Sequence, residues 1–435
     1  MTAREAAHAI WQAALGAADV RPLVRHALRD LDLDLGSTRR VLVLGAGKAS
    51  GAMAAAVEAQ LGDRVADGFV VVKDGYAVPT RRVRIVEAGH PVPDARGERA
   101  AATILEHARI AGADDLVFML ISGGGSALMP APVPPLTLQE KRTVTQLLLA
   151  AGATITELNA VRKHLSLLKG GQLARAAAPA RVVTLVLSDV IGDPLDVIAS
   201  GPTAPDSSTF DDAIAVLRRR GVWDAMPPSV RARLEAGARG EVQETPKPGD
   251  PIFTRVTHHV IGNNALVTDA AVARAAELGY RPTLLTRALE GEAREVARDL
   301  IARAKALTPP ACLIAGGETT VTVRGSGRGG RCQELALAAG LAVEGVDDIV
   351  LLAAGTDGTD GPTDAAGGLA DGASIARARA GGVDPRAALD ANDAHAALGA
   401  SGDLLVSGPT HTNLLDLYLV VRGECPGLGR TDPSH

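Results

Sequence analysis

The segment Val41-Leu42-Val43-Leu44-Gly45-Ala46-Gly47-Lys48-Ala49-Ser50-Gly51 is a short apolar run that passes through glycines into a helical pattern. A continuously apolar strand is typical of a parallel sheet covered on both faces. Glycines let the backbone approach a ligand closely, and a helix N-terminus attracts anions. We expect Lys48 in the first helical turn, where a cation opposes the helix dipole and therefore suggests a function. The alternatives are a surface lysine in a tight turn and a loose dinucleotide fingerprint, with Asp74 as the nearest ribose-binding carboxylate.

Apolar strands and helical patterns alternate through the first half of the chain. The predicted strands are 41–44, 69–73, 83–87, 116–121 and 182–187, and the predicted helices are 47–61, 95–110, 138–150 and 155–168. This alternation predicts an α/β fold. We expect residues 1–243 to form a Rossmann-like three-layer sandwich with a mainly parallel sheet.

A polar, proline-rich stretch at 244–251 predicts a linker, after which a second pattern begins. The predicted strands there are 256–261, 283–285, 312–315, 320–323, 349–354 and 417–421, and the predicted helices are 265–278 and 333–342. These elements predict a second α/β domain over residues 252–423. The short polar tail at 424–435 is expected to be disordered.

The composition excludes several classes of function. Hydrophobic residues make up 46% of the 435 residues and charged residues 22%, which is ordinary for a globular protein. A formal net charge of -5 and an aromatic content of 2% argue against a nucleic-acid partner. No apolar run approaches the roughly 20 residues that span a bilayer, and the three cysteines have no close pairing. We therefore expect a cytoplasmic protein without a membrane partner; its oligomeric state stays open, with a homodimer as one candidate.

A glycine-rich loop, Ser122-Gly123-Gly124-Gly125-Ser126, follows the predicted strand at 116–121. Three consecutive glycines have a high conformational entropy cost, which a purely structural loop seldom requires. They favour a nest of backbone N–H groups around phosphate oxygens, with Ser122 and Ser126 as further donors. A flexible structural turn is the alternative.

Two groups of polar residues follow this loop. Asn159, Arg162 and Ser166 share one face of a predicted helix, which is either a solvated surface or the wall of a site. Asp189 and Asp193 follow a predicted strand, at the edge where open α/β sheets bind ligands. These two carboxylates are candidates for holding Mg²⁺, and ordinary turn chemistry is the alternative.

In the second domain, glycine-rich segments carry arginines and aspartates. Arg331 follows the run at 324–330, and its guanidinium fork matches phosphate or carboxylate oxygens. A solvated basic hairpin is the alternative. Asp357, Asp360 and Asp364 come after a predicted strand and indicate a base or metal ligands.

Taken in order, these segments resemble the glycerate 2-kinase family with the C-terminal MOFRL module, whose members are sometimes mislabelled as hydroxypyruvate reductases. The resemblance runs from about Arg4 to Val421 and rests on Gly-Ala-Gly-Lys at 45–48, His-Pro-Val-Pro-Asp at 90–94, Ser-Gly-Gly-Gly-Ser at 122–126, Lys-Gly-Gly at 169–171, Ser-Asp at 188–189, Gly-Glu at 317–318, Gly-Arg-Cys-Gln-Glu at 330–334, Gly-Thr-Asp-Gly at 355–358 and Gly-Pro-Thr-His-Thr-Asn at 408–413. It implies two α/β domains with the active site in the cleft between them. It also implies transfer of the ATP γ-phosphoryl group to the 2-hydroxyl of D-glycerate, with Mg²⁺.

The residues and the resemblance together give a hypothesis for the site. Lys48, Arg331 and Asp357 match the lysine, arginine and aspartate of the family's cleft. The two cations would stabilise charge on the transferred phosphoryl group, and the aspartate would accept the hydroxyl proton. The predicted phosphate-binding residues are Ser122, Gly123, Gly124, Gly125, Ser126 and Lys169. The predicted substrate-binding residues are Asn159, Arg162, Glu318, Gln333, Glu334 and Asn413. The predicted metal ligands are Asp189 and Asp193.

Two other functions compete with a kinase. An NAD(P)H-dependent hydroxypyruvate reductase would use the turn at 45–51 for its dinucleotide, but it leaves the triple-glycine loop and Arg331 unexplained. A non-catalytic sensor of sugar acids would bind ligand without producing ADP. The sequence contains no DNA-binding module or basic patch through which a sensor could act.

Overall fold

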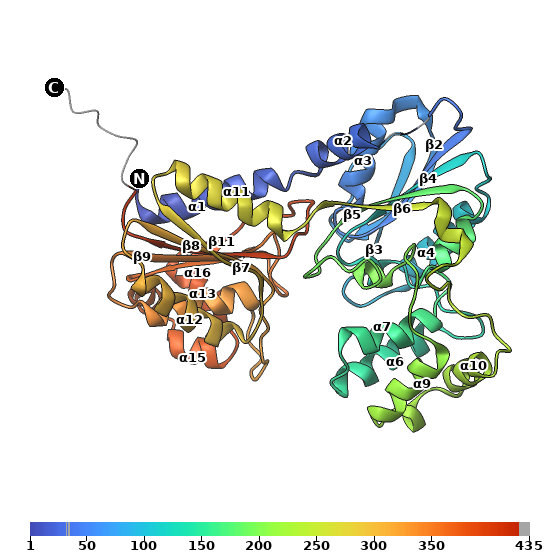
Figure 1. Ribbon diagram of the computed structural model, residues 1–435. Coiled ribbons are helices and arrows are strands. Elements are labelled where there is room, and N and C mark those ends of the chain that lie inside the picture. The colour runs from blue at the N-terminus through green and yellow to red at the C-terminus, as the bar shows by residue number, and fades with distance from the viewer. Residues whose placement is uncertain (32, 34, 426–435) are drawn as a thin grey trace. The chain divides into compact units, whose positions relative to one another are not determined.

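The computed structural model of the chain describes residues 1–31, 33 and 35–425 and forms two compact units. The first unit is Val20–Ile261, and the second combines Met1–Asp19 with the described residues from Gly262 to Cys425 (Figure 1). This division differs from the predicted domains at 1–243 and 252–423. From residue 426 on, the tail predicted to be disordered lies outside the described residues.

The first unit is built on a six-stranded sheet with the strand order β3-β2-β1-β4-β5-β6. Its strands are β1 (Arg40–Ala46), β2 (Val65–Lys73), β3 (Val83–Ala88), β4 (Asp115–Ile121), β5 (Arg181–Leu187) and β6 (Val256–Gly262). The pairs β1–β2, β2–β3, β1–β4 and β4–β5 are parallel, as the apolar runs predicted. The strand expected to open the second domain is instead β6, an edge strand of this first sheet.

Helices cover both faces of this sheet (Figure 1). They include α2 (Val20–Asp30), α3 (Ser50–Leu61), α4 (Ala95–Arg109), α5 (Gly125–Leu128) and α8 (Gln172–Ala177). A separate group of helices, α6 (Leu138–Ala150), α7 (Ile155–His164), α9 (Phe210–Arg219) and α10 (Pro228–Ala238), has an apolar core of its own. Capping boxes fix the starts of α6 and α7, because Thr137 and Thr154 each exchange hydrogen bonds with a glutamate three residues on.

The second unit contains a six-stranded mixed sheet with the order β11-β10-β9-β12-β8-β7. Its strands are β7 (Arg281–Leu289), β8 (Ala311–Gly317), β9 (Ile349–Gly355), β10 (Gly367–Asp371), β11 (Leu404–Leu405) and β12 (Asp416–Arg422). Only β7 and β8 pair in parallel; the other pairs are antiparallel. The strand predicted at 320–323 is wrong, since only an isolated bridge between Glu292 and Thr320 forms there.

Helices lie on both faces of the second sheet as well (Figure 1). One face carries α1 (Ala3–Ala17) and α11 (Asn264–Glu277), and the other carries helices that include α12 (Ala293–Ala306), α13 (Arg331–Ala342), α15 (Pro385–Asp390) and α16 (Ala394–Ser401); α14 (Ser374–Ala380) packs on α16. The N-terminal helix α1 belongs to this unit because its apolar side, with Ile10 and Trp11 buried, packs on α11, β9 and β12. Arg4 anchors it further through ion pairs to Asp371 and Asp403.

Candidate active site

The carboxyl ends of β1, β4 and β5 meet at one edge of the first sheet, because Ala46 pairs with Ile121 and Ile121 with Val186. The strand order reverses between β1 and β4, and open α/β sheets bind ligands at such a reversal. The glycine segments after β1 and β4 therefore lie beside each other at this edge. The loop with Asp189 and Asp193, which follows β5, starts from the same edge.

The turn after β1 and the loop after β4 are bound closely to one another. The Lys48 N–H donates to the Gly123 carbonyl over 2.9 Å, and the Ala49 N–H donates to Ser122 Oγ over 2.9 Å. Gly47 has a φ of 146°, and a Cβ added to it would lie 2.1 Å from Ser122 Oγ. Position 47 therefore requires glycine, since a side chain would push the two loops apart.

The structure corrects the predicted position of Lys48. Helix α3 begins at Ser50, so Lys48 lies in the preceding turn and not in the first helical turn. Ser122 is fully buried, and its hydroxyl contacts Ser50 Oγ at 3.1 Å as well as accepting from Ala49. Its side chain therefore holds the two loops together and is not presented to a ligand.

Two backbone N–H groups of the glycine-rich loop are without an acceptor in the described part of the chain. Gly124 has a φ of 87°, and the Gly125 N–H returns to the Ser122 carbonyl over 3.2 Å. Within the described part of the chain, no hydrogen bond uses the N–H of Gly123 or Gly124. These two groups are the donors that the predicted phosphate nest would offer.

Ser126, at the end of this loop, joins three of the predicted ligand-binding residues. Its Oγ accepts hydrogen bonds from Arg162 Nη2 at 2.5 Å and from Lys169 Nζ at 2.7 Å. It also contacts Ser200 Oγ at 3.0 Å, and Ser200 Oγ donates to Asn159 Oδ1 at 2.9 Å. Arg162 and Asn159 were predicted to bind substrate and Lys169 to bind phosphate, but all three belong to one hydrogen-bonded group.

Burial changes the acid–base properties of this group. Burial and the charges of Arg162 and Lys141 lower the pKa of Lys169 well below its usual value. The buried polar atoms without a hydrogen-bond partner among the described residues include Asn159 Nδ2, Arg162 Nε and Lys141 Nζ.

Helix α7 ends at His164, so Ser166 lies beyond the helix and does not share its polar face. Lys141 was missed by the sequence analysis, because a lysine in a surface-like helical pattern carries no signal of burial.

A second group of charged residues lies at one edge of the second sheet. Asp416 pairs with Gly317 at the end of β8 and with Gly355 at the end of β9, which places Glu318 and Asp357 at the same edge. Arg331, the first residue of α13, binds Asp416 through Nε at 2.5 Å and Nη2 at 2.8 Å. Its Nη1 lies 2.9 Å from Glu318.

Asp416 was missed by the sequence analysis, although a carboxylate at the start of an apolar strand is a usable signal. It is fully buried and also accepts a hydrogen bond from the Tyr418 hydroxyl at 3.0 Å. Burial opposes the charge of Arg331, but the neighbouring Asp416 carboxylate outweighs it and raises the arginine pKa above its usual value. Arg331 is therefore held in a fixed orientation by carboxylates of its own unit.

Other predicted site residues of this unit are engaged inside the protein. Gln333 is fully buried and donates to the Asp360 carboxylate at 3.1 Å, and Glu334 is paired with Arg294 at 2.6 Å. Both arrangements favour a structural role over contact with substrate. Asp360 accepts the N–H groups of Cys332 and Gln333 and so caps α13. Burial raises the pKa of Asp360 to about 6.

Asp357 and Asn413 are both buried in loops of the second unit. Asp357 Oδ1 accepts the Thr359 N–H at 2.9 Å.

The predicted metal ligands, Asp189 and Asp193 of the first unit, are partly buried. Among residues 1–31, 33 and 35–425, no group of three or more histidines, cysteines or carboxylates is assembled as a metal site. A nucleotide-bound Mg²⁺ takes most of its ligands from phosphates and water and needs only one or two carboxylates from the protein.

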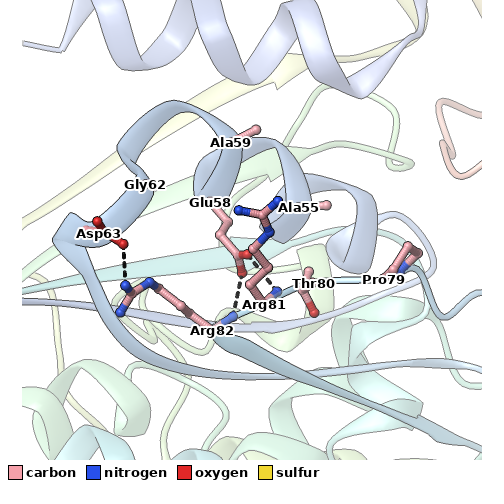
Figure 2. Close-up of a pocket in the computed structure, with 9 residues that line it drawn as sticks. All are labelled: Ala55, Glu58, Ala59, Gly62, Asp63, Pro79, Thr80, Arg81 and Arg82. Atoms are coloured by element: carbon pink, nitrogen blue, oxygen red, sulfur yellow. Dashed lines mark hydrogen bonds and ion pairs between the residues drawn. The ribbon is translucent and has the colours of Figure 1, made fainter.

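A surface hollow of about 480 Å³ lies elsewhere on the first unit, between α3 and the segment before β3 (Figure 2). Its central carboxylate, Glu58, accepts the N–H groups of Arg81, Arg82 and Val83 at 2.6, 3.0 and 3.2 Å. Arg82 is paired with Asp63. These polar groups bind one another, which indicates that the hollow connects α3 to the segment before β3 and has a structural role.

Comparison with known proteins gives the family of the chain. A family model described as a domain of unknown function (DUF4147) matches residues 6–235, and the MOFRL family model matches residues 311–416. The chain is 45% identical over 404 residues to the D-glycerate 2-kinase of Thermotoga maritima, covering 91% of this chain and 93% of that protein. It is 37% identical over 496 residues to human glycerate kinase, covering 97% of this chain and 93% of the human protein.

Two further comparisons bear on the fold and on the alternative function. A protein of Agrobacterium vitis that is provisionally named a hydroxypyruvate reductase is 45% identical over 432 residues, covering 97% of this chain and 95% of that protein. The crystal structure of the glycerate kinase of Thermotoga maritima matches with a TM-score of 0.84 and 43% identity, covering 96% of this chain and 99% of that chain. With relatives this similar over nearly its full length, the chain belongs to the glycerate 2-kinase family.

Proposed function

We propose that the chain is a glycerate kinase that transfers the γ-phosphoryl group of ATP to the 2-hydroxyl of D-glycerate. The observation that carries this proposal is the pair of buried lysines, Lys141 and Lys169, with the half-buried Arg162, beside the glycine-rich loop at the reversal point of the first sheet. A nest of N–H groups next to buried positive charge is suited to phosphate oxygens. The 2-position is supported by the printed name of the Thermotoga maritima relative, D-glycerate 2-kinase.

The roles of individual residues form part of the proposal. Gly123 and Gly124 offer N–H groups to nucleotide phosphates, and Lys48 stabilises the charge that develops on the transferred group. Arg331 contributes positive charge, held in place by Asp416, and Asp357 accepts the proton of the hydroxyl. Asp189 and Asp193 would hold Mg²⁺, which supplies charge neutralisation of the nucleotide phosphates when bound.

The direct test measures two reactions with the purified full-length chain. We expect ADP release with ATP and D-glycerate, and phosphorus NMR of the product should show phosphorylation at the 2-hydroxyl. Oxidation of NADH with hydroxypyruvate, without ADP release in the first assay, would establish the reductase instead. A ligand-induced rise in melting temperature without either reaction would indicate a sensor.

Lys48→Ala tests the proposed role of the lysine after β1. Removal of one stabilising group for transition-state charge typically lowers turnover about 100- to 1,000-fold. The melting temperature of the variant, measured beside its turnover, separates a loss of catalysis from a loss of folding, since the bond from the Lys48 N–H to the Gly123 carbonyl is kept. Turnover within about threefold of the unmodified protein would remove Lys48 from the mechanism.

Every helix in the described ranges is too short or too polar to cross a bilayer.

A further inference from the structure

Three cationic side chains, Lys141, Arg162 and Lys169, are gathered next to the glycine-rich loop. Arg162 and Lys169 both donate to Ser126 Oγ, and Lys169 Nζ also donates to the Ser126 carbonyl at 2.9 Å. Lys141 and Lys169 are 5% and 0% exposed. Lys141 lies on α6, which packs on α7, the helix that carries Arg162. In keeping with this packing, the charges of Arg162 and Lys141 both lower the pKa of Lys169.

Among the described residues, no carboxylate lies within ion-pair distance of Lys141, Arg162 or Lys169. The charge of Glu98 opposes the lowering of the Lys141 pKa, but burial and Arg162 outweigh it. A buried cation is costly unless it is paired, so three unpaired cations in one place require an explanation.

The residues next in sequence show that this chain does supply counter-charges elsewhere. Lys163, which follows Arg162, lies 3.2 Å from the buried Asp206 and 3.3 Å from Asp196. His164 Nε2 lies 2.8 Å from Glu244. Of the three consecutive basic residues at 162–164, only Arg162 lacks a carboxylate partner in the described structure. The missing counter-charge is therefore specific to the cluster beside Ser126.

We propose that Lys141, Arg162 and Lys169 form one buried binding site for a phosphate-class oxyanion with at least two negative charges. Lys141, whose Nζ has no hydrogen-bond partner among the described residues, is the third cation of that site. The unbonded N–H groups of Gly123 and Gly124 lie in the loop that ends at Ser126, so they can complete the coordination. Only the source of the anion rests on the proposed function: a nucleotide phosphate or the phosphorylated product.

The charge count favours phosphate over a carboxylate alone. When all three side chains are protonated, one carboxylate leaves most of their positive charge uncompensated, whereas a phosphate group carries two charges and has three oxygens for hydrogen bonds. Burial, Arg162 and the weaker opposing charge of Glu98 together set the pKa of Lys141 at about 7 without a ligand. A bound dianion favours the protonated form, so binding above neutral pH takes up a proton.

Titration calorimetry of the full-length chain tests the site with inorganic phosphate, ADP, 2-phosphoglycerate and D-glycerate as separate ligands. Lys141→Met removes the charge and keeps the length of the side chain. We expect it to weaken binding of phosphate-bearing ligands about 10- to 100-fold. Lys305→Met, an exposed lysine of the second unit, is the matched control and should bind like the unmodified protein. Loss of affinity for ADP alone identifies the nucleotide as the source, and loss for 2-phosphoglycerate alone identifies the product.

Two outcomes would overturn the inference. One is unchanged affinity of Lys141→Met for all three phosphate-bearing ligands, and the other is a loss confined to D-glycerate. Lys141→Met should fold, since it removes an unpaired buried charge; Lys141→Gln provides a second variant with the same expected loss of binding. Proton uptake, measured in buffers of different ionisation enthalpy, should fall in Lys141→Met and persist in Lys305→Met.

These results can be separated from those of the proposed function. Phosphate binding that depends on Lys141 in a chain without kinase activity would support the site and refute the kinase. Kinase activity in a chain whose phosphate binding does not depend on Lys141 would support the kinase and refute the site.

Discussion

The two units of the chain use positive charge in opposite ways. In the first unit, Lys141, Arg162 and Lys169 are gathered without a carboxylate partner among the described residues. In the second unit, Arg331 is held by both oxygens of the buried Asp416 and by Glu318. The first arrangement leaves charge for a ligand, while the second fixes the direction of one guanidinium. A cationic residue in a motif therefore does not show by itself whether it binds a ligand or a carboxylate of its own chain.

The largest expected effect concerns the neutralised arginine. Arg331→Ala leaves Asp416 buried without its counter-charge, and we expect a loss of about 3–5 kcal/mol of unfolding free energy. Chemical denaturation of the full chain measures this loss. The double variant Arg331→Met with Asp416→Leu removes both charges and should recover most of the stability without activity. A loss below about 1 kcal/mol for Arg331→Ala would show that the pair is not important for stability.

At Lys141 we expect the free energy of unfolding to rise on substitution instead of falling. Lys141→Met removes an uncompensated buried charge, so we expect a gain on the order of 1–4 kcal/mol at pH about 7. Lys163→Met, also at a buried lysine but one paired with Asp206, should lose stability instead. Equal effects of the two substitutions would contradict the distinction between paired and unpaired lysines.

The gain from Lys141→Met should depend on pH. The pKa of Lys141 is lowered from 10.5 to about 7 by burial and by Arg162, with Glu98 opposing; Lys169 is the other cation nearby. Because the folded-state pKa is depressed, the unfolded chain takes up a proton at Lys141 at a higher pH than the folded protein does. The free energy of unfolding of the unmodified protein therefore falls as the pH drops from about 10.5 to about 7. The difference in melting temperature between the variant and the unmodified protein should therefore shrink from pH 7 toward pH 10. A constant difference over this range would contradict the depressed pKa.

A smaller effect is expected at the serine that joins the cation cluster. Ser126→Ala removes the oxygen that accepts from both Arg162 and Lys169, and we expect a loss of about 1–3 kcal/mol in thermal unfolding. The backbone carbonyl of Ser126 still binds Lys169, which limits the damage. Ser200→Ala, which touches neither cation, is the comparison; a larger loss there would place the centre of the network at Ser200.

The smallest effect is expected at the hollow in Figure 2. Glu58→Gln keeps one oxygen, which can accept the N–H groups of Arg82 and Val83, but it removes the charge and the acceptor of the Arg81 N–H, so we expect a loss below about 1.5 kcal/mol and unchanged turnover. These N–H groups outweigh burial and hold the pKa of Glu58 below its usual value. The contribution is thus lost as the pH falls through that lowered pKa. A clear fall in turnover would show that the hollow takes part in catalysis.

The parallel strands of the first unit could be predicted because each is a continuous apolar run. The runs at 41–44 and 116–121 correspond to β1 and β4, and the predicted helix at 138–150 is α6. The prediction failed where local patterns are ambiguous. The strand at 256–261 follows a linker-like segment in sequence but completes the first sheet, and α1 packs against the second unit from the other end of the chain.

The sequence by itself determined the α/β alternation, the glycine segments after β1 and β4, and the resemblance that led to a glycerate kinase. These properties depend on local periodicity and on backbone freedom, which neighbouring residues encode. Only the tertiary structure decided which charged groups have partners. Asp416 pairs with Arg331 from 85 residues away in sequence, whereas Lys141 is buried without a carboxylate partner among the residues that the structure describes. Charge compensation is a property of distances in space, and spacing along the chain does not contain them.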